Sequence, residues 1–346
     1  MIKKINGERD CFVLLTDNTS YVIAITPSGH PEHIYYGKKL GFDTPDEVEA
    51  ARQKRAFEIG NAIRYSDEHP TVFLEDMCLE FSGFGHGDIR EPFIELVHKD
   101  GSRSTDFTYK GFETDDKKPA FSNMPSSYDK SGKYEHLRLD FEDNGLILEL
   151  HYCVYPDCDI ITRWAKLTNK TTETVELERL LSNQLDLYTN GWAVSSFRGT
   201  WAREMQRDTL VLNQGKYVIE SRVGISSSRA NPFFMLHDKT ATEDYGSVYG
   251  FNLIYSGNHY EAVEVNAYEK TRVVQGINPS GFRFIIKAGD TFEAPEAVMT
   301  YTDSGFGGQS VNMHRFVKEH IVRGEWADKE RPVLLNSWEA SYFNIT

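Results

Sequence analysis

Residues 145–156 read GLILELHYCVYP, and apolar side chains occupy every second position from Leu146 to Val154. Glu149 and His151 fall on the opposite face of the same stretch. A period of two residues is typical of a β-strand that buries one face. The Asp-Asn-Gly at 143–145 is a turn signal directly before it. This part of the chain therefore predicts a half-buried strand entered through a tight turn.

Similar alternating segments recur along the chain, around 175–182, 248–256, 261–268 and 282–286, with polar turn clusters between them. Many short strands joined by polar turns predict an all-β domain built as a sandwich or as stacked sheets. Two segments lack this alternating pattern. Residues 45–58 carry a proline and acidic residues at their head and predict a short helix. Residues 311–323 predict a second helix that packs on the domain and leads out of it, because their apolar residues recur at helical spacing: Met313, Phe316, Val317, His320 and Ile321.

The composition indicates a folded protein and excludes some classes of binding partner. Of the 346 residues, 40% are hydrophobic and 26% are charged, which is enough for a substantial core. The net charge of −14 argues against binding a nucleic-acid backbone or an anionic membrane surface. No apolar run approaches the length of a membrane span. A neutral small molecule or a protein partner remains, and the 13% of aromatic residues suits strands as well as a surface that stacks on sugars.

The cysteines and the N-terminus favour a cytoplasmic protein that binds no metal or other cofactor. The first residues lack the apolar stretch of a signal peptide. Cys153 and Cys158 flank a turn, so a local disulfide is conceivable beside the alternative of reduced thiols. Neither a CxxC nor an HExxH spacing occurs, so no metal site is expected.

The polar stretch 324–331 predicts a boundary, with one domain over 1–325 and a linker plus a new element over 326–346. After it, PVLLNSWEASYFN opens with an apolar run and turns polar and aromatic. Such a run is typical of a buried parallel strand, the first of an α/β barrel, whose C-terminal end faces an active site. A lone barrel strand has nothing to pair with. We therefore expect this sequence to be a fragment that stops as the barrel begins.

Nine short motifs occur along the chain in a characteristic order. In that order and spacing, the chain resembles the N-terminal half of glycoside hydrolase family 36 α-galactosidases. The motifs are GHPEHIYYGKKL from Gly29, FGHGDIREP from Phe84, DGSRSTDFTY from Asp100, the LDL around Asp186, GTWARE around Trp201, ISSSRANPF around Asn231, YGFNLIYSGN from Tyr249, TRVVQGINP around Arg272, and RPVLLNSWEASYF from Arg331.

The resemblance implies a β-supersandwich of the galactose-mutarotase type, followed by a (β/α)8 barrel and a small C-terminal β-domain. It implies hydrolysis of terminal α-galactosyl residues of melibiose, raffinose and stachyose with retention of configuration. That chemistry needs two carboxyl groups about 5 Å apart. In the family both are aspartates on later barrel strands, and their motifs are absent here, so no catalytic residue is expected in this chain. The resemblance also implies a homo-oligomer, a tetramer, for the full-length enzyme.

Few of the family's sugar-site residues have a match in this sequence. Trp338, in NSWEAS, matches a tryptophan that forms a wall of the galactose pocket, where an indole face packs against ring C–H bonds. Some tetrameric members send an aspartate into a neighbour's site from the loop before an Arg-Ala-Phe triplet. Here Lys54 stands at that position, followed by Arg55, so a sugar contact from this loop is in doubt. Trp201 is expected either to anchor an interface with the barrel or to pack in the core. Asp88 and Arg90 are expected to form an ion pair.

Two other functions remain open at this point. The chain could be a stand-alone carbohydrate-binding module that uses an aromatic-rich sheet face. It could also be an aldose epimerase of the mutarotase type, which needs a histidine and a glutamate that converge on the sugar O1 and O5. The 11 histidines show no matching context for that chemistry.

Overall fold

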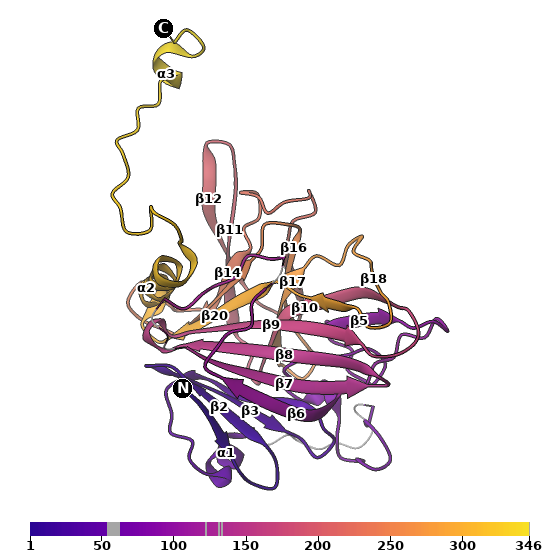
Figure 1. The fold of residues 1–346 in the computed structure, drawn as a ribbon. Helices are drawn as coiled ribbons and strands as arrows, with labels where there is room; N and C mark the ends of the chain where they lie inside the picture. The colour runs from indigo at the N-terminus through magenta and orange to yellow at the C-terminus, as the bar shows by residue number, and fades with distance from the viewer. Residues whose placement is uncertain (54–62, 122, 131, 133, 346) are drawn as a thin grey trace.

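The structure, a computed structural model, describes residues 1–53, 63–121, 123–130, 132 and 134–345. Within these residues the strands form antiparallel sheets of four, six and ten strands (Figure 1), which confirms the all-β prediction. The four-stranded sheet is a meander of consecutive strands: β1 (Ile2–Ile5), β2 (Cys11–Leu15), β3 (Thr19–Ile25) and β4 (Pro31–Lys38).

The ten-stranded sheet is the largest layer. Its strands follow one another across the sheet, with β19 (Thr291–Glu293) paired to β9 at its edge: β12 (Arg203–Val211), β11 (Trp192–Thr200), β14 (Phe233–Asp238), β15 (Val248–Ile254), β20 (Glu296–Thr302), β9 (Ile160–Asn169), β8 (Leu146–Tyr155), β7 (Glu135–Asp143) and β6 (Thr108–Asp115).

The six-stranded sheet packs against the large one. Its strands lie in the order β13 (Gly215–Glu220), β16 (His259–Val265), β17 (Thr271–Ile277), β10 (Val175–Leu187) and β18 (Phe284–Ile286), with β5 (Ile94–Val97) also paired to β10.

One large apolar cluster, here called the core, includes residues of all three sheets. The alternating stretch in β8 points its apolar face into this core, with Leu148, Leu150 and Tyr152 fully buried. Each such side chain contributes about 1.5–3 kcal/mol by leaving water. Glu149 and His151 face the other side of the sheet, as the two-residue period requires. The predicted strand and its orientation are therefore confirmed.

The turn between β7 and β8 depends on left-handed backbone at Asn144 (φ 47°) and Gly145 (φ 84°). These angles at Asn-Gly form the two-residue hairpin turn that suits the twist of antiparallel strands.

Gly145→Ala is expected to destabilise the protein by about 1–2 kcal/mol, because a Cβ disfavours this conformation and would lie 3.1 Å from Thr171 Cγ2. Urea unfolding followed by circular dichroism measures the change. Gly111→Ala is the control, since Gly111 lies in β6 with open space around it and no positive φ. Equal midpoints for the two variants would contradict this account of the turn.

The short helix α1 (Pro45–Ala51) begins where the sequence predicts and ends earlier. Thr44 caps it: its hydroxyl accepts from the Glu47 N–H, and the Glu47 carboxylate accepts from the Thr44 N–H at 2.8 Å. Arg52 leaves the helical conformation. The rest of the predicted helix, from residue 54, lies outside the described residues.

The second helix, α2 (Gly305–Phe316), starts six residues before its prediction and continues as a π-helical turn, Val317–Ile321. Met313 and Phe316 pack on the face of the large sheet opposite the core, beside Trp164 and Tyr155. His320 is buried and its Nδ1 hydrogen-bonds the Tyr128 carbonyl at 2.9 Å, which confirms it as a packing residue. Val317, predicted on the buried stripe, is exposed instead because the helix widens there.

The chain leaves the domain after the π-helical turn and projects away from it (Figure 1). The predicted barrel strand at 332–335 is not formed: the chain there is extended, without a paired strand among the described residues, and Val333, Leu334 and Leu335 are almost wholly exposed. The physical reason is that a strand requires a neighbour to accept its hydrogen bonds. The short helix α3 (Trp338–Ser341) follows. Within the described part of the chain, every helix is too short or too polar to cross a membrane.

Candidate functional site

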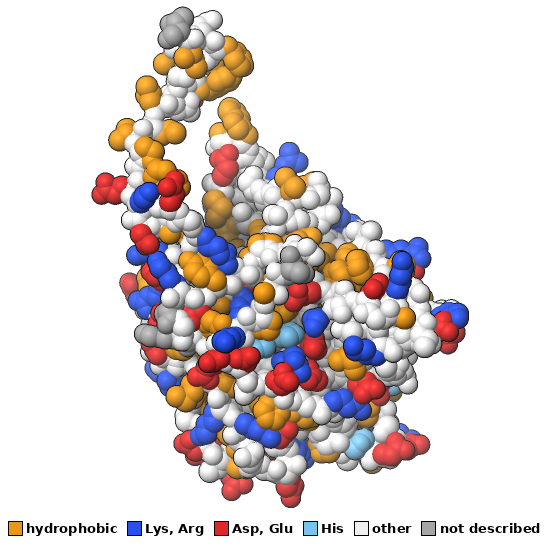
Figure 2. Space-filling model, in the orientation of Figure 1, with side chains coloured by type: hydrophobic (Ala, Val, Ile, Leu, Met, Phe, Trp, Pro, Cys, Tyr) orange, Lys and Arg blue, Asp and Glu red, His pale blue; other side chains and the backbone are white. Residues whose placement is uncertain are grey.

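Trp338, the predicted sugar-site residue, lies at the start of α3 in the projecting C-terminal segment. Its side chain is 46% exposed, and its ring contacts are edge-on to Tyr342 and Phe343, at 5.2 and 5.0 Å between centroids. Figure 2 shows hydrophobic side chains along this segment, with none of the main body covering them. Exposed apolar residues in a continuous run indicate a surface that another folded part covers.

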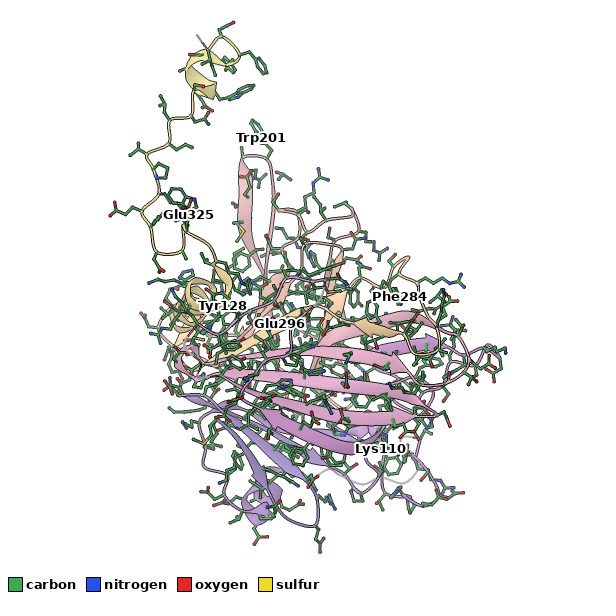
Figure 3. The ribbon with its side chains drawn as sticks, in the orientation of Figure 1. Lys110, Tyr128, Trp201, Phe284, Glu296 and Glu325 are labelled. Carbon is green, nitrogen blue, oxygen red and sulfur yellow. The ribbon has the colours of Figure 1, made fainter. Side chains whose placement is uncertain are left out.

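Trp201 lies at the tip of the hairpin formed by β11 and β12, whose end projects beyond the other strands of the ten-stranded sheet (Figure 3). It is 92% exposed, and every residue of β12 is exposed. The alternative of core packing is therefore wrong, because the end of the hairpin extends beyond β14, its neighbour in the ten-stranded sheet, and no described residue covers Trp201. An exposed indole at the end of an arm suits the other alternative, an interface anchor.

Lys54 and Arg55, the remaining predicted sugar-site residues, lie outside the described residues. Of the predicted sugar-site residues, the structure describes Trp338 and Trp201, and it places them on different segments. Trp201 and α3 project at the same end of the molecule, on separate segments (Figures 1 and 3).

Three of the sequence motifs meet in one buried ionic cluster. Arg272 Nη2 lies 2.7 Å from Asp186 Oδ2 and 2.9 Å from Asp88 Oδ2, and Arg90 Nε lies 2.7 Å from Asp88 Oδ1. These side chains are at most 3% exposed. Burial alone raises the pKa of Asp88, but Arg272 and Arg90 outweigh it and hold that pKa well below its ordinary value. The predicted ion pair of Asp88 and Arg90 is confirmed.

A second buried cluster surrounds Glu80. Its carboxylate accepts hydrogen bonds from Tyr21 at 2.8 Å and Tyr152 at 2.7 Å, contacts His33 Nδ1 at 2.8 Å, and pairs with Arg163 at 3.1 Å. Arg163 and His33 lower the pKa of Glu80 against the opposing effect of its burial. Every oxygen of this carboxylate is already engaged, so the cluster is a structural tie between sheets.

The hollow that the described residues form beside Asp88 is small. The hollow lined by Asp88, His86 and Ser82 measures about 20 Å³, which is room for one water molecule. His86 contacts Ser104 Oγ at 3.2 Å, and its ring lies 5.8 Å from that of Tyr65. Among the described residues, these motifs therefore contribute buried ion pairs to the fold.

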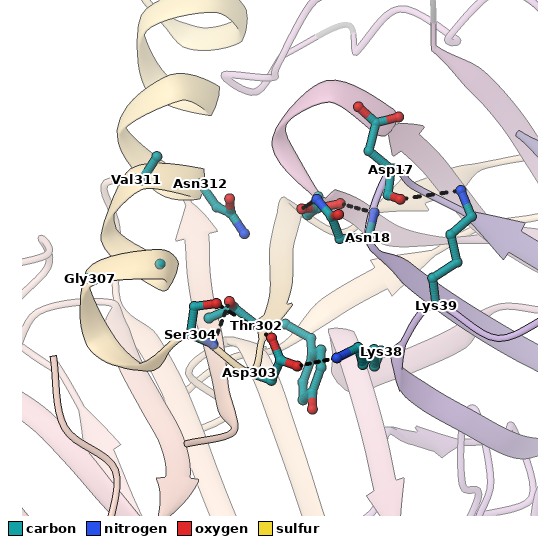
Figure 4. A pocket seen from close by; sticks show the side chains of 13 residues that line it. Asp17, Asn18, Lys38, Lys39, Thr302, Asp303, Ser304, Gly307, Val311 and Asn312 are labelled. Carbon is teal, nitrogen blue, oxygen red and sulfur yellow. Dashed lines mark hydrogen bonds and ion pairs between the residues drawn. The ribbon is translucent and has the colours of Figure 1, made fainter. Parts of the chain in front are cut away.

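A larger cavity of about 550 Å³ lies between the ends of β3 and β4 and the start of α2 (Figure 4). Two of its lysines are paired with other residues of its lining: Lys38 with Asp303 at 2.9 Å, and Lys39 with the Asp17 carbonyl at 3.3 Å. The first amides of α2 donate to carbonyls of residues 242, 243 and 246. No helix amide is left to hold an anion, so this cavity is a crevice within the domain.

One group of side chains has the residue types of a metal site. Among the described residues, Asp157, Cys158 and His320 bring possible ligand atoms within 4.8 Å of one another. Burial raises the pKa of the Cys158 thiol, and a protonated thiol is a poor metal ligand. The thiols of Cys153 and Cys158 are both free, so they form no local disulfide in this structure.

Comparison with known proteins shows the family. The model of the glycosyl hydrolase family 36 N-terminal domain matches residues 29–287, which is most of the chain. The chain belongs to this family. A melibiase model matches residues 291–346, directly after the family 36 domain.

The relatives of this family 36 chain are α-galactosidases. Alpha-galactosidase AgaA of Geobacillus stearothermophilus is 34% identical over 98% of this chain and 46% of its own length. The crystal structure of an α-galactosidase from Lactobacillus brevis superposes with a TM-score of 0.93 at 35% identity, over 98% of this chain and 46% of the other. Structures of AgaA variants with raffinose or with stachyose each give a TM-score of 0.92 at 34% identity, over 96% of this chain and 46% of theirs. The chain spans about half the length of the curated relatives it matches.

The family 36 assignment confirms the resemblance seen in the nine motifs. Residues 332–346, in the projecting segment, lie within the part that matches the melibiase model. The Arg272 cluster lies in the part that matches the N-terminal domain model.

Proposed function

We propose that this chain is the N-terminal β-domain of a retaining α-galactosidase and that it supports a catalytic barrel. The observation that carries the proposal is the continuous match to α-galactosidases across 98% of the chain, through the family 36 domain and into the melibiase segment. A stand-alone module would have no reason to extend into that segment. The enzyme is therefore the better supported of the two alternatives.

The proposed substrates are neutral oligosaccharides with a terminal α-galactosyl residue: melibiose, raffinose and stachyose. Relatives crystallised with raffinose and with stachyose support this choice. Trp338 is proposed to form one wall of the galactose pocket. Its exposed ring sits in an apolar segment that a barrel would cover, which leaves the indole face available to sugar C–H bonds.

We further propose that the enzyme is cytoplasmic and acts as a homo-oligomer, a tetramer. The exposed hairpin of β11 and β12 supports the oligomer, because Trp201 at its tip and Met205 beside it present apolar surface far from the core. Light scattering on the protein extended through a melibiase domain measures the oligomeric state, and a monomer would contradict this part of the proposal.

Hydrolysis of an aryl α-galactoside tests the main proposal. The 346-residue chain alone is expected to release no aryl alcohol above the buffer rate, because it carries none of the family's aspartate motifs. The protein extended through the barrel is expected to turn the substrate over with retention. Turnover by the chain alone would contradict the proposal that catalysis requires the barrel. An inactive extended protein would contradict the proposal that the protein is an α-galactosidase.

A further inference from the structure

Three side chains from distant parts of the chain meet where α2 packs on the large sheet. Asp157 and Cys158 lie in the short 3₁₀-helical turn Pro156–Cys158 between β8 and β9, and His320 lies in the π-helical turn after α2. Their possible ligand atoms, a carboxylate oxygen, a sulfur and a ring nitrogen, all lie within 4.8 Å of one another. We call these three residues the turn cluster. It lies close to the point where the chain leaves the domain (Figure 1).

His320 has one ring nitrogen bonded and the other without a partner. Its Nδ1 is 2.9 Å from the Tyr128 carbonyl oxygen, and because a carbonyl only accepts, Nδ1 carries the hydrogen and donates. In the neutral ring, Nε2 therefore holds a lone pair. That atom is buried and has no hydrogen-bond partner among the described residues. Histidines that bind a metal share this arrangement, since their second nitrogen donates to a carbonyl or a carboxylate.

The unpartnered nitrogen lies beside the carboxylate of Asp157. His320 Nε2 and Asp157 Oδ1 are 3.9 Å apart, which is too far for a hydrogen bond. A lone pair and a carboxylate at this distance repel each other. Either a second proton on the ring or a metal ion between the two atoms removes this repulsion, and only the metal ion also engages Cys158.

The carboxylate gives an ion access to the buried nitrogen. The side chain of Asp157 is 47% exposed, whereas that of His320 is 3% exposed. Asp157 thus forms the open side of the turn cluster, and an ion bound by its carboxylate is already next to the other two ligand atoms. No preformed cavity is required, because the ion takes its place between atoms that lie close together.

The imidazole ring is held in this position by its surroundings. Its centroid lies 4.5 Å from that of Tyr155 and 5.6 Å from that of Phe316. The π-helical turn widens the helix, so that His320 is buried against β8 while Val317 is exposed. Single π-helical turns are frequent at functional sites, because they change the direction of one side chain without ending the helix.

The ligand atoms select zinc among the common divalent cations. Imidazole and thiolate suit Zn²⁺, whereas Mg²⁺ and Ca²⁺ prefer oxygen ligands alone. Tetrahedral zinc would hold the three ligand atoms about 3.4–3.6 Å apart, so shifts of about 1 Å are enough, and the exposed carboxylate is free to make most of them. The fourth position remains for water on the open side.

Two features limit the affinity. The raised pKa of the Cys158 thiol means that zinc has to displace a proton, which passes to the solvent as the bond between zinc and sulfur forms. Arg315 donates to the backbone carbonyl of Asp157 and so places a positive charge near the turn cluster. We therefore expect micromolar binding and not the tighter binding of a structural zinc site.

We propose that Asp157, Cys158 and His320 bind one Zn²⁺ ion, which fastens the π-helical turn to the turn between β8 and β9. The ion would stabilise the last part of the domain before the projecting segment. This inference does not depend on the proposed α-galactosidase activity, because binding is measured on the chain itself.

Calorimetric titration with zinc chloride tests the site on the 346-residue chain, prepared without a histidine tag and freed of metal by a chelator. One Zn²⁺ per chain is expected to bind with a dissociation constant in the micromolar range. Magnesium and calcium chloride are expected to give no heat of binding. Cobalt chloride is expected to give the near-ultraviolet charge-transfer band of a cobalt–thiolate bond, which identifies sulfur as a ligand.

Substitution of each ligand is expected to weaken zinc binding about tenfold or more. Asp157→Asn keeps the shape of an exposed side chain and is expected to fold. His320→Asn keeps an amide that can donate to the Tyr128 carbonyl but removes Nε2. Cys158→Ala is also expected to abolish the cobalt–thiolate band. If circular dichroism shows that one of the two buried variants is unfolded, Asp157→Asn alone decides the test.

Two matched variants serve as controls. Cys153→Ala removes another buried, free thiol from the same apolar cluster as Cys158, but one outside the turn cluster. Glu319→Gln changes a carboxylate that is 40% exposed in the same π-helical turn as His320 and also lies outside the turn cluster. Both variants are expected to keep the zinc affinity and the cobalt–thiolate band of the unaltered chain.

Three results would overturn the inference. One is the absence of zinc binding at concentrations up to about 1 mM. Another is unaltered affinity in folded Asp157→Asn protein, since the ion would then be held elsewhere. The third is a cobalt–thiolate band that persists in folded Cys158→Ala protein or is lost in Cys153→Ala protein, because either outcome would assign the sulfur ligand to a different cysteine.

Discussion

Arg272→Met is expected to lower the free energy of unfolding by about 3–5 kcal/mol, because it leaves two buried carboxylates without their main partner. Arg272 pairs with Asp186 and Asp88, and its side chain is fully buried. Methionine replaces the volume but not the charge. Arg90 is then the remaining cation of the cluster. It lies 3.3 Å from Asp186 and already forms an ion pair with Asp88. This loss of free energy lowers the equilibrium constant for folding at least a hundredfold.

Urea unfolding followed by tryptophan fluorescence measures this loss. Arg103→Met is the matched control, since Arg103 pairs with Glu178 on the surface, where an ion pair contributes about 1 kcal/mol or less. A similar cost for both variants would mean that the buried cluster stabilises the fold no more than a surface ion pair does. Arg272→Lys adds a further comparison: it restores one charge without the forked geometry and is expected to recover only part of the stability.

Trp338→Ala is expected to reduce kcat/KM of the proposed α-galactosidase by about 30-fold or more, with most of the change in KM. An indole that packs on a sugar ring contributes about 2 kcal/mol when it is a binding hot spot. The same substitution in the 346-residue chain is expected to leave the free energy of unfolding unchanged. Trp338 touches only its own segment there, so nothing in the core depends on it.

Trp326→Ala provides the control for this prediction. Trp326 is exposed to a similar extent, 44%, and lies in the same projecting segment, beside Arg331 and Lys329. It carries no match to a sugar-binding motif, and we expect kcat/KM to stay within about twofold. Equal effects of the two substitutions would assign Trp338 to the packing of the segment and not to the sugar pocket.

The strands were the most predictable part of this protein. Leu146 to Val154 alternate without interruption, and the side chains of a strand must alternate between its faces, so both the strand and its buried face follow directly. Asn144 and Gly145 tolerate left-handed backbone, which places the turn. The pair of Asp88 and Arg90 was predictable for the same reason, because residues two apart in an extended segment share a face.

Other contacts could not be predicted from local pattern. Arg272 and Asp186 are 86 positions apart, and their pairing depends on the antiparallel register of β17 on β10. The start of α2 was missed because its first residues, Gly305 to Gly308, are poor helix formers. They are helical here because carbonyls of residues 242 and 243 accept their amides. That support comes from a distant loop.

The sequence by itself determined the all-β class, the buried faces of the strands, the turn before β8 and the family. Alternation, turn residues and ordered motifs are local patterns of consecutive residues, so they can be recognised without the fold. Only the tertiary structure decided which charged residues are buried together and which face water. Glu149 and His151 are the clearest case: the alternation in residues 145–156 places them on the polar side of a strand, as any exposed pair would be. The chain before β7 and the residues around β19 turn that side into a cavity, since burial depends on what packs against a surface and not on the strand that forms it.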